Sequence, residues 1–571
     1  MTTRYSQLVD REFDVVVIGA GMFGACIAYA AVQRGLSVAV IDKGDFAAAT
    51  SSNHLKVVHG GIRYLQHLDL VRLRESSWDR SNLLRIAPHL AYRIPIVFPT
   101  YGYGSRSKTL MRAGMFAYDM LTLDRNRGIH LSKNRIPNGS VLGKQELLEM
   151  FPGAQEKGLT GAAVFYDGQM YNPARLVLAF LQSAILKGAV ATNYIKADRL
   201  LRDGTRIVGC GATDVPSGRQ FEIKGRVVIN AAGPWAHRLL DDGLGIKLSP
   251  VPSFSRDLSF VVKKSINSSH AIGCQTESAD SDAILDRGGR HLFLVPWRGM
   301  TLVGVWHRLT AVNPDEIAVS REELQLYLDE LNSIYNGLQL RLSDITRVNT
   351  GLTLFGSKDE QDPSGAHSFA KRSMVVDHSK NGLDGLVTVI GVRATVACSV
   401  AEETIRLVEK KLHKKVHRMS STWKPIHGGV ISDFDALVDD IRHQLPSDNE
   451  SLATAIAHNY GSEYSELFAC ADDALLLTAL NGTNVMAAEG IHAVRNEMAI
   501  SLEDVVLRRT ELGTAGDPGV GVIERIAEVV GRELSWDSIE TAKQVRSVRK
   551  IIEQGGPWEM FEKSAELEMN T

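Results

Sequence analysis

Apolar and polar residues follow one another along the chain in blocks whose spacing changes from that of strands to that of helices. The short apolar run at residues 15–18 is typical of a buried parallel strand. A glycine-rich turn and an apolar helical segment cover residues 19–32, and a second strand at 37–41 ends on Asp42. This order predicts the strand–helix–strand unit of a doubly wound α/β domain.

The turn of this unit has the dinucleotide pattern G-x-G-x-x-G. Gly19 allows a tight turn, Gly21 lets the backbone approach a pyrophosphate, and Gly24 lets the helix pack on the strand. Asp42 stands where an acid accepts hydrogen bonds from a ribose hydroxyl, and its charge disfavours a 2′-phosphate. The pattern therefore predicts FAD or NAD, not NADP. We assign these residues to the cofactor: Gly19, Gly21, Met22, Phe23, Gly24, Asp42 and Lys43.

The next segment, residues 50–65, favours FAD. It reads T-S-S-N-H-L-K-V-V-H-G-G-I-R-Y-L and is rich in hydroxyls, small residues and cations. Such a loop can follow a pyrophosphate and then a flavin ring and donate hydrogen bonds to both. The loop residues assigned to the cofactor are Thr50, Ser51, Ser52, Lys56, Val58, His59, Gly60 and Gly61.

This loop resembles the flavin-contacting stretch T-S-S-x-x-S-K-L-I-H-G-G-L-R-Y-L of the FAD-dependent, quinone-linked glycerol-3-phosphate dehydrogenases. Residues 227–235 resemble the family's second nucleotide motif, and residues 386–395 resemble its third flavin strand. Residues 460–462 and 492–510 are similar to its helical domain. The resemblance implies further FAD contacts from Ala197, Ala232, Gly233, Trp235, Gly391, Arg393, Ala394 and Thr395.

The patterns and the resemblance together imply three structural parts. We expect an α/β FAD-binding domain, Rossmann-like and of the glutathione-reductase or D-amino-acid-oxidase type, from residues 1–85, 151–245 and 357–415. An antiparallel substrate-binding sheet is expected at 246–356, after a helical segment or cap at 86–150. An all-helical domain should occupy 416–571, with frayed residues after about 561.

Composition excludes some classes of function. The 571 residues are 44% hydrophobic and 23% charged, with a net charge of −2, which is ordinary for a globular protein and gives no general attraction to nucleic acid. The 5 cysteines and 17 histidines form no C-x-x-C or H-E-x-x-H pattern, so we expect no metal site and a reducing compartment. Without a signal peptide or an apolar run near ~20 residues, we expect a cytoplasmic protein.

One segment suggests contact with a membrane. Residues 106–121 place apolar side chains near one helical face and basic ones beside it. The apolar set is Leu110, Met111, Met115, Tyr118 and Leu121, and the basic set is Arg106, Lys108 and Arg112. This is typical of an interfacial helix on the inner face of a membrane, where the related dehydrogenases reduce quinone. The alternative is an amphipathic helix packed on the core. A homodimer is also compatible with the sequence.

A flavin dehydrogenase must hold a C–H bond over the flavin, accept a hydroxyl proton and bind the polar groups of the substrate. The resemblance places Arg63 and Tyr64 at the flavin face and gives both a catalytic role, with Arg63 also binding substrate. Arg393 stands where the family carries a lysine; it keeps the charge, but a guanidinium is a poor base. Arg372 matches an arginine that helps to hold substrate.

Departures from the family cluster in the inferred substrate pocket. Thr353 replaces the phosphate-binding arginine of G-V-R-P-L, and Ser259 replaces the active-site histidine of K-G-S-H. The family's I-G-T-T-D becomes V-G-V-W-H, in which Trp306 is expected to reshape the pocket. His307 is an alternative proton acceptor or else a surface histidine.

We therefore expect an FAD-dependent enzyme that oxidises a secondary alcohol to a ketone and passes electrons to quinone or another acceptor. One alternative is the same fold acting on another polyol phosphate, a glycerol phosphodiester, a hydroxy acid or an amine. A second is a non-catalytic FAD-binding module. A nicotinamide-dependent dehydrogenase is disfavoured by the loop at residues 50–64.

Overall fold

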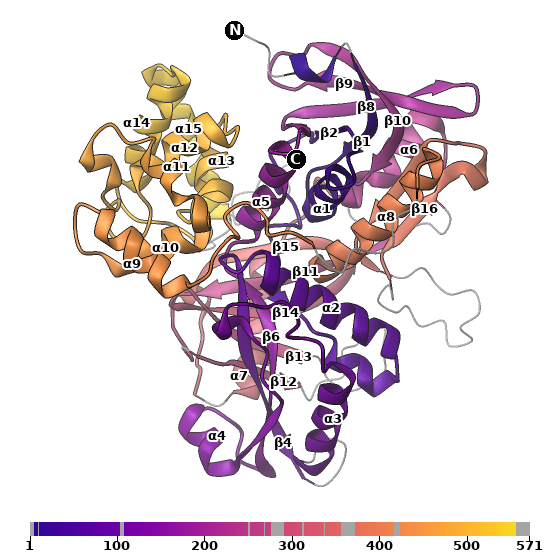
Figure 1. The fold of residues 1–571 in the computed structure, drawn as a ribbon. Helices are drawn as coiled ribbons and strands as arrows, with labels where there is room; N and C mark the ends of the chain where they lie inside the picture. The colour runs from indigo at the N-terminus through magenta and orange to yellow at the C-terminus, as the bar shows by residue number, and fades with distance from the viewer. Residues whose placement is uncertain are drawn as a thin grey trace, which may run out of the picture.

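The computed structural model describes residues 5–9, 11–102, 108–248, 252–267, 269–275, 291–310, 313–335, 337–355, 372–415 and 423–554. Figure 1 shows an α/β part around β1, β2 and β10, a second sheet below it, and a group of helices (orange to yellow) at one side. These parts match the predicted α/β domain with an added antiparallel sheet and C-terminal helices.

The first sheet has the strand order β16-β17-β10-β1-β2-β7. Its central strands are parallel, because each of the pairs β1–β10, β1–β2, β10–β17 and β2–β7 is parallel. Their bounds are β1 (Glu12–Ile18), β2 (Val38–Ile41), β7 (Val190–Thr192), β10 (Gln220–Asn230) and β17 (Leu386–Ile390). The edge strand β16 (Met374–Asp377) and the hairpin of β8 (Ile195–Asp203) and β9 (Arg206–Asp214) are antiparallel.

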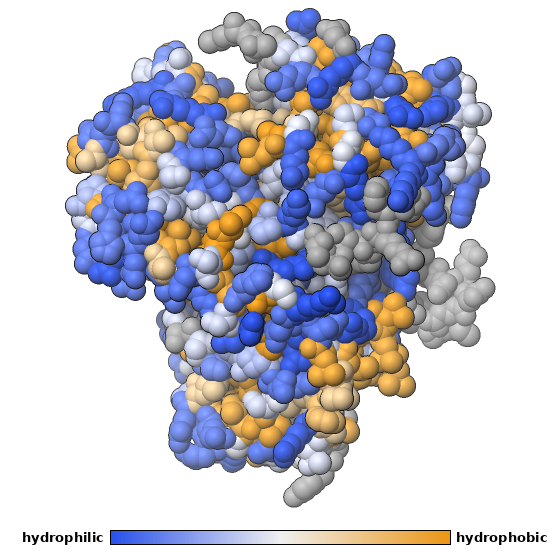
Figure 2. Space-filling view, viewed as in Figure 1, coloured by the Kyte–Doolittle hydropathy of each residue, from blue (hydrophilic) through white to orange (hydrophobic). Residues whose placement is uncertain are grey.

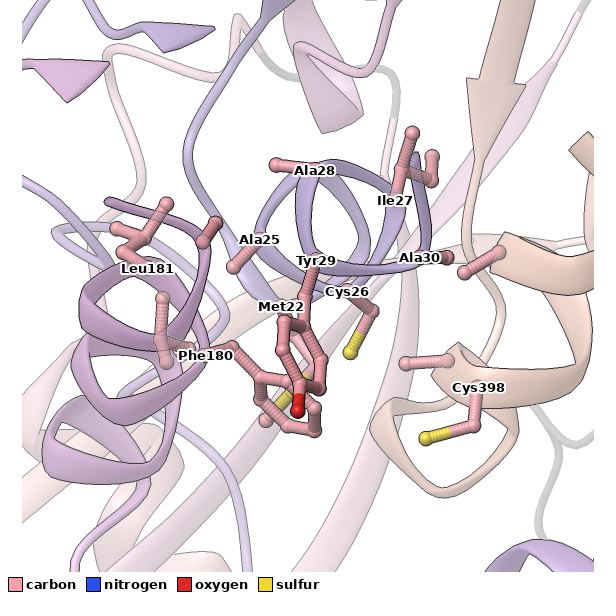
Figure 3. Packing of buried hydrophobic residues seen from close by; sticks show 14 of the residues in the cluster. Met22, Ala25, Cys26, Ile27, Ala28, Tyr29, Ala30, Phe180, Leu181 and Cys398 are labelled. Carbon is pink, nitrogen blue, oxygen red and sulfur yellow. The ribbon is translucent and has the colours of Figure 1, made fainter. Parts of the chain in front are cut away.

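Both faces of this sheet are covered, because its strands are apolar on both faces. α1 (Met22–Val32), α5 (Pro173–Ile185) and α8 (Ala397–Lys411) share a core with Val15 and Val17, while Val16 and Ile18 face α6 (Ala236–Leu244) and the β8–β9 hairpin. Figure 3 shows Met22, Cys26 and Tyr29 of α1 beside Phe180 of α5, with Cys398 of α8 on the other side. The predicted first unit is confirmed.

The second sheet has the order β15-β11-β14-β13-β12-β4-β6-β3, and β5 pairs with β6. Its pairs are antiparallel except β12–β4. α7 (Arg321–Ile334) packs on one face. The strands are β3 (Val57–Val58), β4 (Ala91–Tyr101), β5 (Ser140–Gly143), β6 (Leu159–Met170), β11 (Ser253–Val262), β12 (Ala271–Gln275), β13 (His291–Trp297), β14 (Met300–Thr310) and β15 (Ile345–Phe355).

The prediction of a helical cap at 86–150 was wrong in part. α2 (Leu70–Ile86), α3 (Lys108–Leu121) and α4 (Lys144–Met150) are present, but β4 and β5 belong to the second sheet, as does β6, which was expected in the FAD domain. β4 contains Pro95 and Pro99, and among the described residues it pairs with β12 over only two residues; a strand side with so little pairing tolerates proline. A local pattern cannot identify such a distant partner.

Helices make up the C-terminal part from residue 423 onward, as predicted. They are α9 (Phe434–Gln444), α10 (Glu450–Tyr460), α11 (Tyr464–Phe468), α12 (Ala487–Asn496), α13 (Leu502–Asp504), α14 (Val522–Leu534) and α15 (Ser538–Gln554). Buried ion pairs join them to the α/β part: Asp45 bonds to Arg508 and Arg509, and Arg175 bonds to Glu497. The predicted fraying after residue 561 lies outside the described residues.

The predicted interfacial helix corresponds to α3, although Arg106 lies outside the described residues. Met115 and Tyr118 are buried, and the Tyr118 hydroxyl donates to the Gly60 carbonyl at 2.8 Å. Part of the predicted face, Met115 and Tyr118, therefore packs on the protein. Leu110 of the predicted set is exposed, together with Phe116 and Met120. Among the described helices, none is long and apolar enough to cross a bilayer.

Candidate active site

The glycine turn lies at the carboxyl end of β1, where backbone segments approach too closely for side chains. Gly19 has φ +102°, and a Cβ there would lie 2.5 Å from the Ala231 carbonyl oxygen. A Cβ on Gly24 would lie 1.9 Å from the Gly19 carbonyl oxygen, and one on Gly21 2.8 Å from Ser51 Oγ. A side chain at any of these three positions would meet neighbouring atoms. The glycines thus let a pyrophosphate come close to the backbone at the start of α1.

Asp42 ends β2 beside this turn. Its carboxylate accepts the backbone N–H of Ala20 at 2.7 Å and of Gly44 at 3.0 Å. Burial raises the pKa of the Asp42 carboxyl to about 6, although both backbone hydrogen bonds lower it. The position suits an acceptor for ribose hydroxyls, and this role of Asp42 stays a prediction.

The structure brings two other predicted cofactor residues together. Lys43 Nζ lies 4.0 Å from the ring centroid of Trp235. Asp315 accepts the Trp235 indole N–H at 2.8 Å and lies 3.3 Å from Lys43 Nζ. No motif in the sequence marked Asp315, because its role depends only on this contact. Ala197 lies on β8 opposite Ala212, and its cofactor contact stays a prediction.

The loop of residues 50–65, which we call the flavin loop, connects the two sheets. Ser51 Oγ accepts the Met22 N–H at 3.0 Å, at the start of α1. Thr50 Oγ1 donates to the Leu352 carbonyl at 3.2 Å and accepts the Leu352 N–H at 3.0 Å. Ser52 Oγ donates to the Ala47 carbonyl at 2.6 Å. The hydroxyls of this loop therefore place it between the dinucleotide turn and β15.

The His59–Gly61 segment rests on buried charges that sequence reasoning missed. Asp167 accepts the Gly60 N–H at 2.7 Å and lies 3.1 Å from His59 Nδ1. Arg80 bonds to the same carboxylate at 3.2 Å, and a Cβ on Gly60 would lie 2.0 Å from Arg80 Nη1. Gly61 has φ +85°, and Val58 of β3 pairs with Gly168 of β6, so the whole segment is held in a fixed shape.

Motifs far apart in the sequence close the site. A Cβ on Gly391 would lie 1.8 Å from the ring of Phe23, which places the end of β17 against the start of α1. Ala232 lies 3.0 Å from the Cβ position of Gly19 and precedes Gly233. Ala394 and Thr395 begin the turn that leads into α8. Backbone N–H groups, the hydroxyls of Thr50 and Ser51 and the Asp42 carboxylate thus surround a cradle lined by glycines, and this set of groups fits FAD.

Lys56, another predicted cofactor residue, is a buried lysine close to other cations. Its Nζ donates to the His54 carbonyl at 3.2 Å and lies 4.8 Å from the ring centroid of Trp297. Burial and the charges of Arg298 and Arg347 lower the pKa of the Lys56 ammonium to about 7. The loop therefore carries a cation that can lose its charge near neutral pH.

Guanidinium groups gather around Tyr64. The Cζ atoms of Arg72 and Arg393 lie 4.6 Å and 5.1 Å from the ring centroid of Tyr64. Burial raises the pKa of the Glu75 carboxyl, against the nearby charges of Arg372, Arg393 and Arg72, which lower it. Arg63, next to Tyr64, is exposed. The cations Arg72, Arg372 and Arg393, which we call the arginine cluster, suit an anionic substrate.

The other wall of the site is one face of the second sheet. Gly351 contacts the flavin loop, since a Cβ there would lie 2.9 Å from Thr50 Cγ2. Side chains alternate along a strand, so Thr353 and Asn349 share this face with Gly351. Their partners on β11 are Ser255 and Ser259. Ser259 Oγ and Asn349 Nδ2 are buried without a hydrogen-bond partner among the described residues, which leaves polar atoms for a ligand.

Trp306 does not line this pocket, contrary to the prediction. It is fully buried on the opposite face of the sheet, stacked on Phe260 and on Tyr327 of α7, with ring centroids at 5.5 Å and 4.6 Å. Its indole N–H donates to Glu330 at 2.9 Å. Because neighbouring residues of a strand face opposite ways, His307 points to the flavin-loop side instead.

Comparisons with known proteins cover nearly the whole chain. A family model described as FAD dependent oxidoreductase matches residues 14–391, and one described as C-terminal domain of alpha-glycerophosphate oxidase matches residues 422–541. The mitochondrial glycerol-3-phosphate dehydrogenase of Macaca fascicularis is 30% identical over 571 residues, covering 95% of this chain and 73% of that protein. The glycerol-3-phosphate dehydrogenase of Synechocystis sp. is 26% identical, covering 96% and 98%.

A solved structure has the same fold. The glycerol-3-phosphate dehydrogenase of Bacillus halodurans, complexed with FAD, aligns with a TM-score of 0.73 and 21% identity over 97% of each chain. The similarity therefore includes the α/β part, the second sheet and the C-terminal helices.

Proposed function

The chain belongs to the family of FAD-dependent glycerol-3-phosphate dehydrogenases, and from this premise we propose that it oxidises glycerol 3-phosphate, or an alcohol close to it, to the ketone. FAD, held by the glycine turn after β1 and the loop that begins at Thr50, would supply the acceptor for the hydride of the substrate carbon. The observation that carries the proposal is the arginine cluster next to the flavin loop, because it supplies the charge that a phosphorylated alcohol needs.

The arginine cluster also explains how the pocket can work with threonine at position 353. Arg393 and Arg372 supply cationic donors that can bind a phosphate from the loop side, and Arg72 lies beside them with its Nε donating to Asp69 at 2.5 Å. Substrate binding by Arg63 stays a prediction. The planar guanidinium of Arg393 can also donate two parallel hydrogen bonds to a phosphate, which the ammonium of the family's lysine cannot do. Each charge-assisted hydrogen bond contributes about 1.5–3 kcal/mol, so two such bonds offset the loss of one bidentate clamp.

An anaerobic flavin spectrum tests this proposal. Glycerol 3-phosphate, titrated into the purified yellow protein, should bleach the flavin band near ~450 nm because hydride transfer reduces the bound FAD. If the band persists, glycerol 3-phosphate is not the substrate, and the same titration with other polyol phosphates, glycerol phosphodiesters, hydroxy acids and amines separates the alternatives. A protein that none of them reduces would be a non-catalytic FAD-binding module.

We further propose that electrons leave to a quinone while the enzyme lies on the inner face of a membrane. The support is an apolar patch formed by α3 and the adjoining start of α2, where Figure 2 shows hydrophobic residues gathered at the lower right. We call it the α3 patch, and its exposed members are Leu68, Leu70, Val71, Leu110, Phe116, Met120 and Leu123. A contiguous exposed apolar surface of this kind is typical of proteins that bind a membrane surface. Homodimer formation stays a prediction.

A further inference from the structure

Four side chains of β11 and β15 form a block on the face of the second sheet that the flavin loop covers. The register places Ser259 opposite Asn349 and Val261 opposite Arg347. Residues directly opposite each other, and residues two apart in one strand, point to the same face of a sheet. Val261 shares an apolar cluster with Leu55 of the flavin loop, so this block, which we call the β11–β15 block, lies under that loop.

Two further cations lie beside the block. Lys56 Nζ and Arg298 Cζ lie 4.8 Å and 3.7 Å from the ring centroid of Trp297. Burial and the charges of Arg298 and Arg347 lower the pKa of the Lys56 ammonium. Arg298 Nη1 has Glu511 at 3.1 Å, but among the described residues no carboxylate forms an ion pair with Lys56. The ammonium is thus buried among like charges, which is unfavourable unless an anion joins them.

Arg347 also lacks a close counter-charge in the described part of the chain. Its Nη1 donates to the Ile551 carbonyl at 3.5 Å, which is longer than an ordinary hydrogen bond. Burial lowers the pKa of the Arg347 guanidinium, and the charge of Glu503 opposes this only in part. Glu503 itself accepts a hydrogen bond from Arg508 at 2.8 Å. Arg347 therefore keeps donors for a further partner.

The polar members of the block have donors of their own. Asn349 is 3% exposed and Ser259 is 2% exposed, yet Asn349 Nδ2 and Ser259 Oγ make no hydrogen bond to any described residue. Buried groups of this kind are normally paired. The carboxylate one row away on β11, Asp257, does not reach them, because it accepts from Ser255 at 2.9 Å and lies 2.7 Å from His307 Nδ1.

We propose that Lys56, Arg347, Asn349 and Ser259 form a binding site for a phosphate group, separate from the arginine cluster. The ammonium and the guanidinium supply charge-assisted hydrogen bonds, and the amide and the hydroxyl supply neutral ones. Thr353, at the position of the family's phosphate-binding arginine, lies six residues along β15 from Arg347, about 20 Å at ~3.4 Å per residue. Arg347 is partly exposed, so the anion can enter on its side.

Calorimetric titration of sulfate into the FAD-loaded protein tests the site. The titration uses an Arg393→Gln background, which weakens the arginine cluster, and one sulfate per chain should still bind. Adding Arg347→Gln should weaken this binding by about 10–100-fold, the effect of one charge-assisted hydrogen bond, and adding Asn349→Ala by about two- to tenfold. The matched control is Arg525→Gln, because Arg525 is an exposed arginine of α14 paired with Glu528.

The charge of Lys56 gives the site a second readout. Sulfate keeps its charge between about pH 6 and pH 8.5, whereas the pKa of the Lys56 ammonium is about 7. Arg298 and Arg347 stay charged in this range, and burial and the Lys56 charge lower the pKa of His54 to about 3, which keeps it neutral. Sulfate affinity should therefore fall by about tenfold or more as pH rises, and Lys56→Arg should abolish this fall.

Two further titrations identify the source of the phosphate group. If the group belongs to the substrate, inorganic phosphate and glycerol 3-phosphate should compete, and Arg347→Gln should weaken both. If it belongs to another molecule, inorganic phosphate should bind equally well when glycerol 3-phosphate is saturating. Neither titration requires turnover, so the site can be tested even if glycerol 3-phosphate does not bleach the flavin.

Sulfate affinities within about threefold of the Arg393→Gln background in both Arg347→Gln and Asn349→Ala would overturn the site. So would the absence of sulfate binding to the FAD-loaded Arg393→Gln protein, since FAD itself would then satisfy these groups. The ratio of flavin to protein absorbance reports whether each variant keeps its cofactor site. Arg347→Lys, which keeps the charge, should retain most of the affinity and replaces Arg347→Gln if that variant loses FAD.

Discussion

Single glycines set the space in which the cofactor can lie. Gly21 is the clearest case, because its Cβ position is 2.8 Å from Ser51 Oγ, the group that caps the start of α1. A larger side chain there has to displace Ser51 or occupy the position of the pyrophosphate. A Cβ on Gly391 would likewise meet the ring of Phe23. The absence of a side chain at Gly391 therefore lets the end of β17 pack against the start of α1.

We expect Gly21→Val to abolish FAD retention, because its side chain fills the space of the phosphates. The measurement is the flavin-to-protein absorbance ratio after purification. The matched control is Gly114→Val in α3, where the nearest atom to the Cβ position is 4.0 Å away. A Gly21→Val protein that purifies as yellow as wild type would refute the assignment of this turn to the cofactor.

Among the secondary-structure elements, the contact of α5 with α12 shows how the C-terminal helices are attached. Arg175 of α5 donates to both carboxylate oxygens of Glu497, at 2.6 and 2.7 Å. His492 Nε2 lies 3.4 Å from the same carboxylate. Burial lowers the pKa of His492, but the charge of Glu497 and the hydrogen bonds to Cys470 and Glu497 together outweigh burial and raise the pKa to about 9. Glu497 therefore has two cationic partners.

This contact predicts a pH-dependent contribution to stability. With a folded pKa of about 9 against 6.5 unfolded, protonated His492 stabilises the fold fully below pH 6.5 and loses this effect as pH rises through 9. The shift corresponds to at most about 3 kcal/mol. The melting temperature of His492→Gln should therefore be well below that of wild type at pH 6 and approach it at pH 9.5.

His443→Gln is the control for this comparison, since His443 is exposed on α9. An equal difference between His492→Gln and wild type at both pH values would show that His492 is not charged in the folded protein.

On the scale of the whole molecule, the three parts have different tasks. The α/β part provides the dinucleotide cradle, the second sheet provides the substrate wall, and buried ion pairs fix the C-terminal helices to the α/β part. In Figure 1 the α3 patch lies at the far end of the second sheet from the C-terminal helices. A membrane bound at the patch would therefore not contact those helices.

The α3 patch predicts binding to lipid. Phe116→Asp combined with Met120→Asp should reduce co-sedimentation with vesicles by about tenfold or more, because two charges would have to enter the apolar interface. Reduction of bound FAD by substrate should be unaffected. Val520→Asp is the control, since Val520 is 95% exposed but lies in the C-terminal part. Equal binding of all three proteins would exclude this patch as the membrane contact.

The sequence by itself determined the cofactor and the family. Gly19, Gly21 and Gly24 follow a buried strand, and the loop after residue 50 has its hydroxyls and glycines in a fixed order, so short-range spacing was enough to predict FAD. The C-terminal helices could be predicted for the same reason, since an amphipathic period is a local property. The antiparallel strands β11, β13 and β14 were predicted from their alternation, whereas β12 was not.

Only the tertiary structure decided what each pocket residue does. Which face of β14 meets the flavin loop depends on the pairing register, and that register buried Trp306 under α7 and set His307 beside Asp257. β4 and β6 joined the second sheet through partners distant in the sequence. Asp315, Asp167 and Arg80 became part of the site in the same way, because contacts between distant segments form only when the whole chain is packed.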